Sequence, residues 1–181
     1  MRLFYGLSLP DDVRRETARL ALAAENAFPG RYALPENHHL TLAFLGEVAP
    51  EQLPQAVSVL ERCAAAFPTP RITLDGFSYF NKPSNAILIL KASSSPALEP
   101  LNAALKDALA ENGLPFDPGP FSPHVTLARR ACLGEEPLFP DFPSPIRFTA
   151  ASAHVYLSAR DGENVLRHTP IHTVPFAILP I

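Results

Sequence analysis

The chain has 181 residues, of which 47% are hydrophobic and 18% are charged. This composition is typical of a globular protein with a buried core and excludes a disordered chain. The net charge of −3 argues against a protein that coats duplex DNA through a general positive charge. We therefore expect no duplex DNA partner, whereas a nucleotide or a single RNA end could still bind in a local basic cleft.

The sequence carries no sign of export or membrane insertion. No stretch reaches about 18 uninterrupted apolar residues, and residues 1–6 lack the basic start and long apolar run of a signal peptide. The two cysteines, Cys63 and Cys132, form neither a CxxC motif nor a metal-ligand spacing. They favour buried free thiols in a reducing compartment. We expect a cytoplasmic monomer with no membrane partner.

The first half of the chain alternates strands and helices. Residues 2–9 are largely apolar and predict a strand that ends at Pro10. Asp11 and Asp12 then favour a helix start, and helical spacing continues to about residue 28. A strand over residues 39–45 and a helix over residues 50–67 follow. Strands over residues 71–80 and 86–91 complete a β-α-β-α-β-β order.

The second half begins with a polar run at residues 93–96. This run predicts a helix start, because serine supplies capping oxygens and proline fits the first turn. Gly113 is a typical helix end. A proline-rich approach leads into a strand over residues 124–130, and a proline-rich loop follows at residues 134–145. Two last strands are expected over residues 146–159 and 165–175, with an Asp-Gly turn between them and a short apolar tail after them.

Short strands mixed with three helices predict an α+β protein. At this length we expect one domain over residues 1–181. A motif that occurs once in each half suggests two pseudo-symmetric lobes of antiparallel or mixed sheet, each with one central strand.

That motif is His39-Leu40-Thr41-Leu42-Ala43, repeated 85 positions later as His124-Val125-Thr126-Leu127-Ala128. Side chains alternate along a strand, so each His shares a face with its Thr, with Cα atoms roughly 6.5–7 Å apart. The residue between them faces the core. Of the six histidines, only these two are followed by x-Thr-Leu.

Two histidines and two threonines in one place suit the in-line displacement of a phosphodiester. An imidazole titrates near about 6.5, so one ring can be neutral and the other protonated. One ring then removes a proton from the attacking oxygen, and the other protonates the leaving oxygen. The hydroxyls can hold non-bridging oxygens. This scheme requires no metal and no cofactor, and no carboxylate cluster accompanies the histidines.

Residues 37–46 and 121–129 closely resemble the two signature motifs of the two-histidine phosphoesterases. They are most similar to those of bacterial and archaeal RNA 2',3'-cyclic phosphodiesterases, historically called 2'-5' RNA ligases. The resemblance extends to the opening strand and to residues 156–160. It implies a bilobal α+β fold with helices outside and the motifs facing each other across a central cleft.

The resemblance also implies the reaction and the roles of the residues. The substrate would be an RNA 3' end, or a nucleotide, with a 2',3'-cyclic phosphate, and the product a 2'-phosphate. His39 resembles the proton donor to the leaving 3'-oxygen, and His124 the base that activates water. Thr41 and Thr126 resemble the phosphate-holding hydroxyls. Arg129 could add positive charge near the substrate, although strand alternation points its side chain away from His124.

Two alternatives stay open. The same site could carry out reversible 2'-5' RNA ligation or act on a small cyclic nucleotide, and only substrates separate these reactions. The other alternative is a non-catalytic RNA-binding module, against which the two histidines speak, because a binder needs no acid–base pair.

Other polar and aromatic residues carry weaker signals. His38 should be structural or exposed, because alternation places it opposite His39. His168 and His172 have no partner motif, nor has His154, and Pro170 argues against a helix that would make His168 and His172 metal ligands. Five aromatics could stack on a base, although most should be core: Phe4, Tyr5, Phe80, Phe121 and Tyr156. Four cations could line a cleft mouth, although ordinary surface is expected for each: Arg31, Lys82, Arg130 and Arg160.

Overall fold

The computed structural model describes residues 1–93 and 96–176. These form three α-helices, three short 3-10 helices and nine strands. The helices are α1 (Asp11–Ala27), α2 (Leu53–Ala66), α3 (Leu98–Glu111), η1 (Pro35–Asn37), η2 (Pro50–Gln52) and η3 (Pro83–Asn85). The strands are β1 (Arg2–Ser8), β2 (Arg31–Tyr32), β3 (His39–Glu47), β4 (Arg71–Phe80), β5 (Ala86–Ser93), β6 (His124–Ala131), β7 (Ile146–Thr149), β8 (Ser152–Arg160) and β9 (Leu166–Pro175).

All strand pairs are antiparallel and belong to one curled sheet, in the order β7-β4-β5-β6-β3-β1-β8-β9, with β2 added against β6. The two motif strands, β3 and β6, lie next to each other at the middle of this order. Four strands of this order therefore lie on each side of the junction, β2 is a fifth on the β6 side, and each side contributes one motif strand. The predicted α+β fold class is confirmed.

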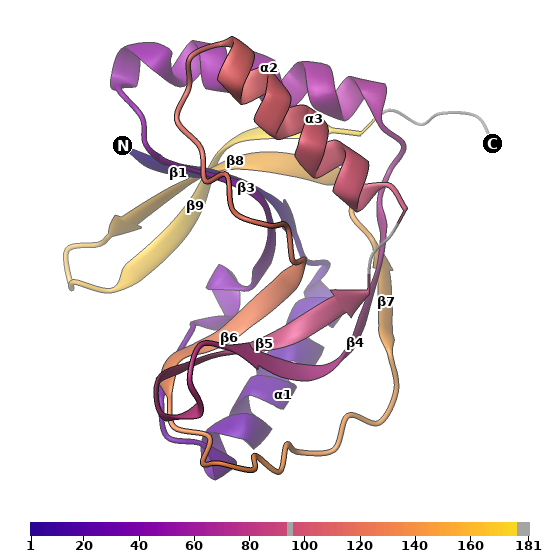
Figure 1. Ribbon diagram of the computed structural model, residues 1–181, viewed down its shortest axis with the longest axis vertical. Helices are drawn as coiled ribbons and strands as arrows, with labels where there is room; N and C mark the ends of the chain where they lie inside the picture. The colour runs from indigo at the N-terminus through magenta and orange to yellow at the C-terminus, as the bar shows by residue number, and fades with distance from the viewer. Residues whose placement is uncertain (94–95, 177–181) are drawn as a thin grey trace.

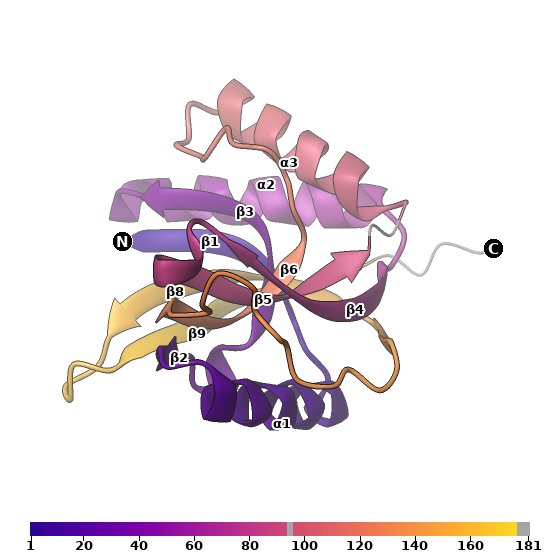
Figure 2. The same cartoon turned by 60° about the horizontal axis from the view of Figure 1, so that its bottom comes forward.

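The helices cover the two halves of the sheet separately. Helices α2 and α3 pack on each other, α2 against β8 and β9 and α3 against β3, whereas α1 packs near β6 in the other half. Figures 1 and 2 show this arrangement, with α2 and α3 together at the top and α1 at the opposite end. Their buried stripes join the sheet in one apolar core, as Leu20, Leu60 and Leu105 illustrate.

Two sequence predictions about the elements need correction, and one short strand was not predicted. The strand expected over residues 146–159 is two strands, because β7 pairs with β4 whereas β8 pairs with β1, so the chain crosses between the halves at Ala150–Ala151. Ser93 ends β5 rather than starting a helix, and α3 begins at Leu98. The two-residue strand β2 was not expected, since it is too short for a pattern.

Other predictions hold or lie beyond the described residues. Gly113 ends α3 with a positive φ of 63°, a backbone conformation that glycine adopts readily. Cys63 is buried as expected, but Cys132 is exposed. Ser94, Ser95 and the tail after Phe176 lie outside the described ranges. Within those ranges no helix is long and apolar enough to span a membrane.

Candidate active site

The two motifs meet where the halves of the sheet join. Leu40 of β3 pairs with Val125 of β6 in antiparallel register. Continuing that register places His39 opposite Thr126 and Thr41 opposite His124. Leu40 and Val125 between them are fully buried, and all four polar residues line one cleft of about 630 Å³. The shared face predicted for each His and Thr is confirmed.

Both imidazoles are held in the same way. Nδ1 of His39 donates to the carbonyl of Asn37 at 2.6 Å, and Nδ1 of His124 donates to the carbonyl of Ser122 at 2.6 Å. A carbonyl can only accept, so each Nδ1 carries the proton and each Nε2 of a neutral ring offers a lone pair. Nε2 of His39 accepts from the hydroxyl of Thr41 at 3.1 Å. Each Nε2 is therefore the ring nitrogen that is available to a ligand in the cleft.

Burial keeps both rings neutral in the substrate-free protein. Loss of hydration lowers the pKa of His39 to about 3, although the hydrogen bond to the Asn37 carbonyl acts in the opposite direction. The charges of His168 and His124 lower this pKa by smaller amounts. Burial also lowers the pKa of His124, against the hydrogen bond to the Ser122 carbonyl, and the positive charge of Arg129 lowers it further. A ring that acts as an acid must therefore gain its proton with the help of a negatively charged substrate.

Aromatic rings pack against both imidazoles. Phe4 stacks on His39 with ring centroids 4.6 Å apart, and Tyr156 stacks on Phe4 at 4.9 Å. Phe80 contacts His124 edge-on at 5.0 Å. Three of the five predicted aromatics therefore support the histidines. Tyr5 is core, and its hydroxyl donates to the Ala56 carbonyl at 2.6 Å.

The cleft is strongly basic although the whole chain is acidic. Among the described residues, its lining contains five arginines and no Asp or Glu. None of these arginines belongs to an ion pair between described residues. Arg31, Arg130 and Arg160, for which ordinary surface was expected, lie in this lining, whereas Lys82 does not. The five residues are Arg2, Arg31, Arg129, Arg130 and Arg160.

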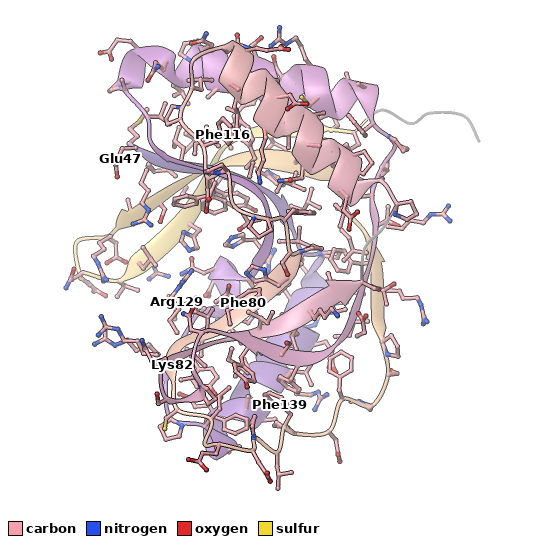
Figure 3. All side chains as sticks on the ribbon, viewed as in Figure 1. Glu47, Phe80, Lys82, Phe116, Arg129 and Phe139 are labelled. Atoms are coloured by element: carbon pink, nitrogen blue, oxygen red, sulfur yellow. The ribbon has the colours of Figure 1, made fainter. Side chains whose placement is uncertain are left out.

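The predicted direction of Arg129 is wrong. Its side chain lines the cleft with His124 and lowers that residue's pKa. Figure 3 shows Arg129 in the opening between the two halves, near Phe80. The register of β6 against β5 shifts twice between Thr126 and Ala131, and Arg130 has a positive φ of 54°. Such bulges break the strict alternation on which the prediction relied.

A family model described as the 2'-5' RNA ligase superfamily matches residues 9–162. The chain belongs to the 2'-5' RNA ligase superfamily. This confirms the family predicted from the two motifs.

Relatives in this superfamily share most of the chain. An RNA 2',3'-cyclic phosphodiesterase of Thermus thermophilus is 37% identical over 72% of this chain and 69% of its own length. An Escherichia coli protein of the same name is 32% identical over 72% of each chain. The crystal structure of TT0787 of Thermus thermophilus superposes with a TM-score of 0.79 at 25% identity, over 97% of this chain and 98% of that one. The crystal structure of Escherichia coli LigT in complex with 3'-AMP superposes with a TM-score of 0.77 at 27% identity, over 97% of each chain.

Two cleft residues of this superfamily member were not assigned from sequence. His168 of β9 lies edge-on to His39, with centroids 5.1 Å apart, and lines the cleft. Asn37 supplies the carbonyl that holds His39. Asn37 could have been noticed from its place in the first motif, whereas nothing near His168 in the sequence points to the site.

The other histidines are structural. His38 is buried, as one of the two expected alternatives, and its Nδ1 lies 2.9 Å from the Thr17 hydroxyl. His154 is buried among hydroxyls on β1, β8 and β9. His172 pairs with Glu61 and, unlike His168, does not line the cleft. Within the described residues, no three His, Cys, Asp or Glu side chains form a group that could hold a metal ion.

Proposed function

We propose that this protein hydrolyses the 2',3'-cyclic phosphate at an RNA 3' end, or on a nucleotide, to a 2'-phosphate. The work is done by a His/His acid–base pair with two phosphate-binding threonines and needs no metal or cofactor. The observation that carries the proposal is the antiparallel pairing of Leu40 with Val125, which sets each His-x-Thr pair against the other. The names of the Thermus and Escherichia coli relatives support the same reaction.

The reaction is an in-line displacement at phosphorus. Nε2 of His124 accepts a proton from water as the water oxygen bonds to phosphorus. The bond from phosphorus to the 3'-oxygen breaks, and Nε2 of His39 donates its proton to that oxygen. The products are a 2'-phosphate and a free 3'-hydroxyl, and exchange with solvent then restores both rings.

The remaining groups hold the anion. Thr41 and Thr126 donate to the two non-bridging oxygens, where negative charge builds up in the transition state. Arg129 lies at the same wall of the cleft and binds the phosphate by charge. The described residues of the cleft lining include no carboxylate, which favours an anionic ligand over a cationic one.

The proposal treats residues 1–181 as one bilobal domain that works as a monomer in the cytoplasm, without a duplex DNA partner. One sheet runs through both halves, so the site needs both of them. Both cysteines are free thiols, which suits a reducing compartment.

The decisive test uses an oligoribonucleotide that ends in a 2',3'-cyclic phosphate, incubated with the protein and an excess of chelator. We expect turnover to a 2'-phosphate, identified by phosphorus NMR through its coupling to the 2' proton. In water labelled with oxygen-18, one label should enter the phosphate. The same oligonucleotide with a 3'-phosphate should not react. A 3'-phosphate product, or loss of turnover with chelator, would contradict the proposal, and joining of ends to a 5'-hydroxyl strand would instead favour ligation.

The pH dependence should reflect the lowered pKa values of both histidines. Activity falls at low pH as the base becomes protonated and falls at high pH as the acid loses its proton. Because burial lowers both pKa values in the free protein, kcat/KM should be bell-shaped with its maximum below about pH 6.5. In the complex the phosphate anion stabilises imidazolium, so the bell for kcat should lie at higher pH. A kcat/KM that keeps rising to pH 8 would contradict this assignment.

A further inference from the structure

Asn37 joins the first motif to a distant edge of the sheet. It is the last residue of η1, and its side chain is buried. Its Nδ2 donates to the Leu166 carbonyl at 2.8 Å, and its Oδ1 accepts from the His168 amide at 2.9 Å. Strand β9 is the last in the sheet order, with β8 on its other side. The single amide of Asn37 therefore occupies the position of a further strand at the free edge of β9.

The same residue holds the ring of His39. Its backbone carbonyl accepts the Nδ1 proton at 2.6 Å. Its backbone amide donates to the Leu34 carbonyl at 2.8 Å, so the residue is fixed through main chain and side chain alike. A hydrogen bond to Nδ1 decides which nitrogen carries the proton and how the ring is turned. Here it leaves Nε2 directed at Thr41 and the cleft.

Asn37 also positions a second neighbour of His39. The bond to the His168 amide fixes the part of β9 that places the His168 ring edge-on to His39 at 5.1 Å. One side-chain amide thus acts on two contacts of the His39 ring, the carbonyl at Nδ1 and the ring at its edge.

The second motif lacks this anchor. His124 donates to the carbonyl of Ser122, the residue two positions earlier, just as His39 does with Asn37. Ser122 is exposed, and its hydroxyl makes no hydrogen bond to any described residue. The two carbonyls hold their rings in the same way, but of the two residues only Asn37 is tied to another strand by its own side chain.

We propose that Asn37 is a positioning residue for His39, whose side-chain amide anchors to β9 the carbonyl that sets the tautomer and direction of the acid. The acid role of His39 rests on the proposed function, whereas the anchoring of its ring does not. A misplacement of about 1 Å in a reacting group can cost about 10²-fold in rate. A matched pair of variants, Asn37→Ala and Ser122→Ala, separates the anchor from the carbonyl, because both keep the carbonyl.

The kinetic test compares these variants with the cyclic phosphate substrate. In Asn37→Ala we expect kcat to fall about 10- to 100-fold with KM within about threefold of the wild type. Ser122→Ala keeps the carbonyl and removes only a hydroxyl, so kcat should fall far less than in Asn37→Ala. A rise in KM with unchanged kcat would overturn the proposal, because it would make Asn37 a substrate-binding residue.

The spectroscopic test needs no substrate. Nitrogen-15 NMR of the imidazoles at pH 7.5 should find His39 and His124 of the wild type protonated at Nδ1. In Asn37→Ala the His39 signals should move to those of mixed tautomers while the His124 signals stay. If the wild type lacks turnover, this readout still tests the anchor, so the two proposals fail separately.

Circular dichroism and the melting temperature check that each variant is folded. Asn37→Ser serves as a second variant, because its hydroxyl can reach one of the two β9 groups but cannot span both. An unchanged His39 tautomer in either folded variant would overturn the proposal. So would an equal loss of tautomer at His39 and His124, because it would reveal general loosening of the fold.

Discussion

His39→Ala and His124→Ala should each lower kcat for the cyclic phosphate by about 10⁴-fold, the upper end of what general acid–base catalysis contributes. Each ring presents Nε2 to the cleft, and the third described histidine of the cleft lining, His168, lies on β9 and not on a motif strand. The double variant should be little worse than either single one, because the two rings act as a unit. Single-turnover rates measure the loss.

His172→Ala is the matched control, since that histidine lies outside the cleft and pairs with Glu61. Its activity should equal that of the wild type. An aryl phosphodiester separates the two roles, because a phenolate leaves without being protonated. His39→Ala should then recover most of its activity relative to the wild type, while His124→Ala should not. The reverse pattern would make His124 the acid and His39 the base. Full activity of either variant on the cyclic phosphate would contradict the mechanism.

The centre of the site could be predicted from sequence because it depends on a local rule. His39 and Thr41 are two positions apart on a regular strand, so alternation alone places them on one face. The same holds for His124 and Thr126. Leu40 and Val125 between them are buried, as the rule requires. That the two strands pair with each other could be implied only by resemblance, since no local pattern encodes it.

The rest of the cleft depends on contacts that no local pattern carries. Arg129 reaches the site because bulges in β6 reverse the alternation after Thr126. Asn37 meets β9 across 129 and 131 residues of sequence, and His168 reaches His39 only through the same strand. Arg31 lies at the cleft because β2 pairs with β6, which places Arg31 opposite Arg129. Each cation looks like ordinary surface by itself, and the basic cleft appears only when the sheet assembles.

Thr41→Val and Thr126→Val should each lower kcat by about 10²- to 10³-fold, as expected for the loss of one donor to the transition-state anion. Valine keeps the size and branching of threonine, so packing changes little. The Thr41 hydroxyl donates to Nε2 of His39 in the free protein at 3.1 Å, and it must turn to the phosphate when substrate enters. That bond stabilises the neutral ring, so Thr41→Val should also raise the pKa of His39 and move the His39 limb of the kcat/KM profile to higher pH. Thr126→Val should leave that limb in place.

Thr41→Ser and Thr126→Ser keep the hydroxyl and should retain most of the activity. A cyclic phosphorothioate tests where each hydroxyl points. If each Thr donates to one non-bridging oxygen, sulfur at one of these positions removes the bond to Thr41 and sulfur at the other removes the bond to Thr126. The two valine variants should then prefer opposite diastereomers. The same preference in both variants would place both hydroxyls on one oxygen, and the symmetric grip that the register of β3 and β6 implies would be wrong.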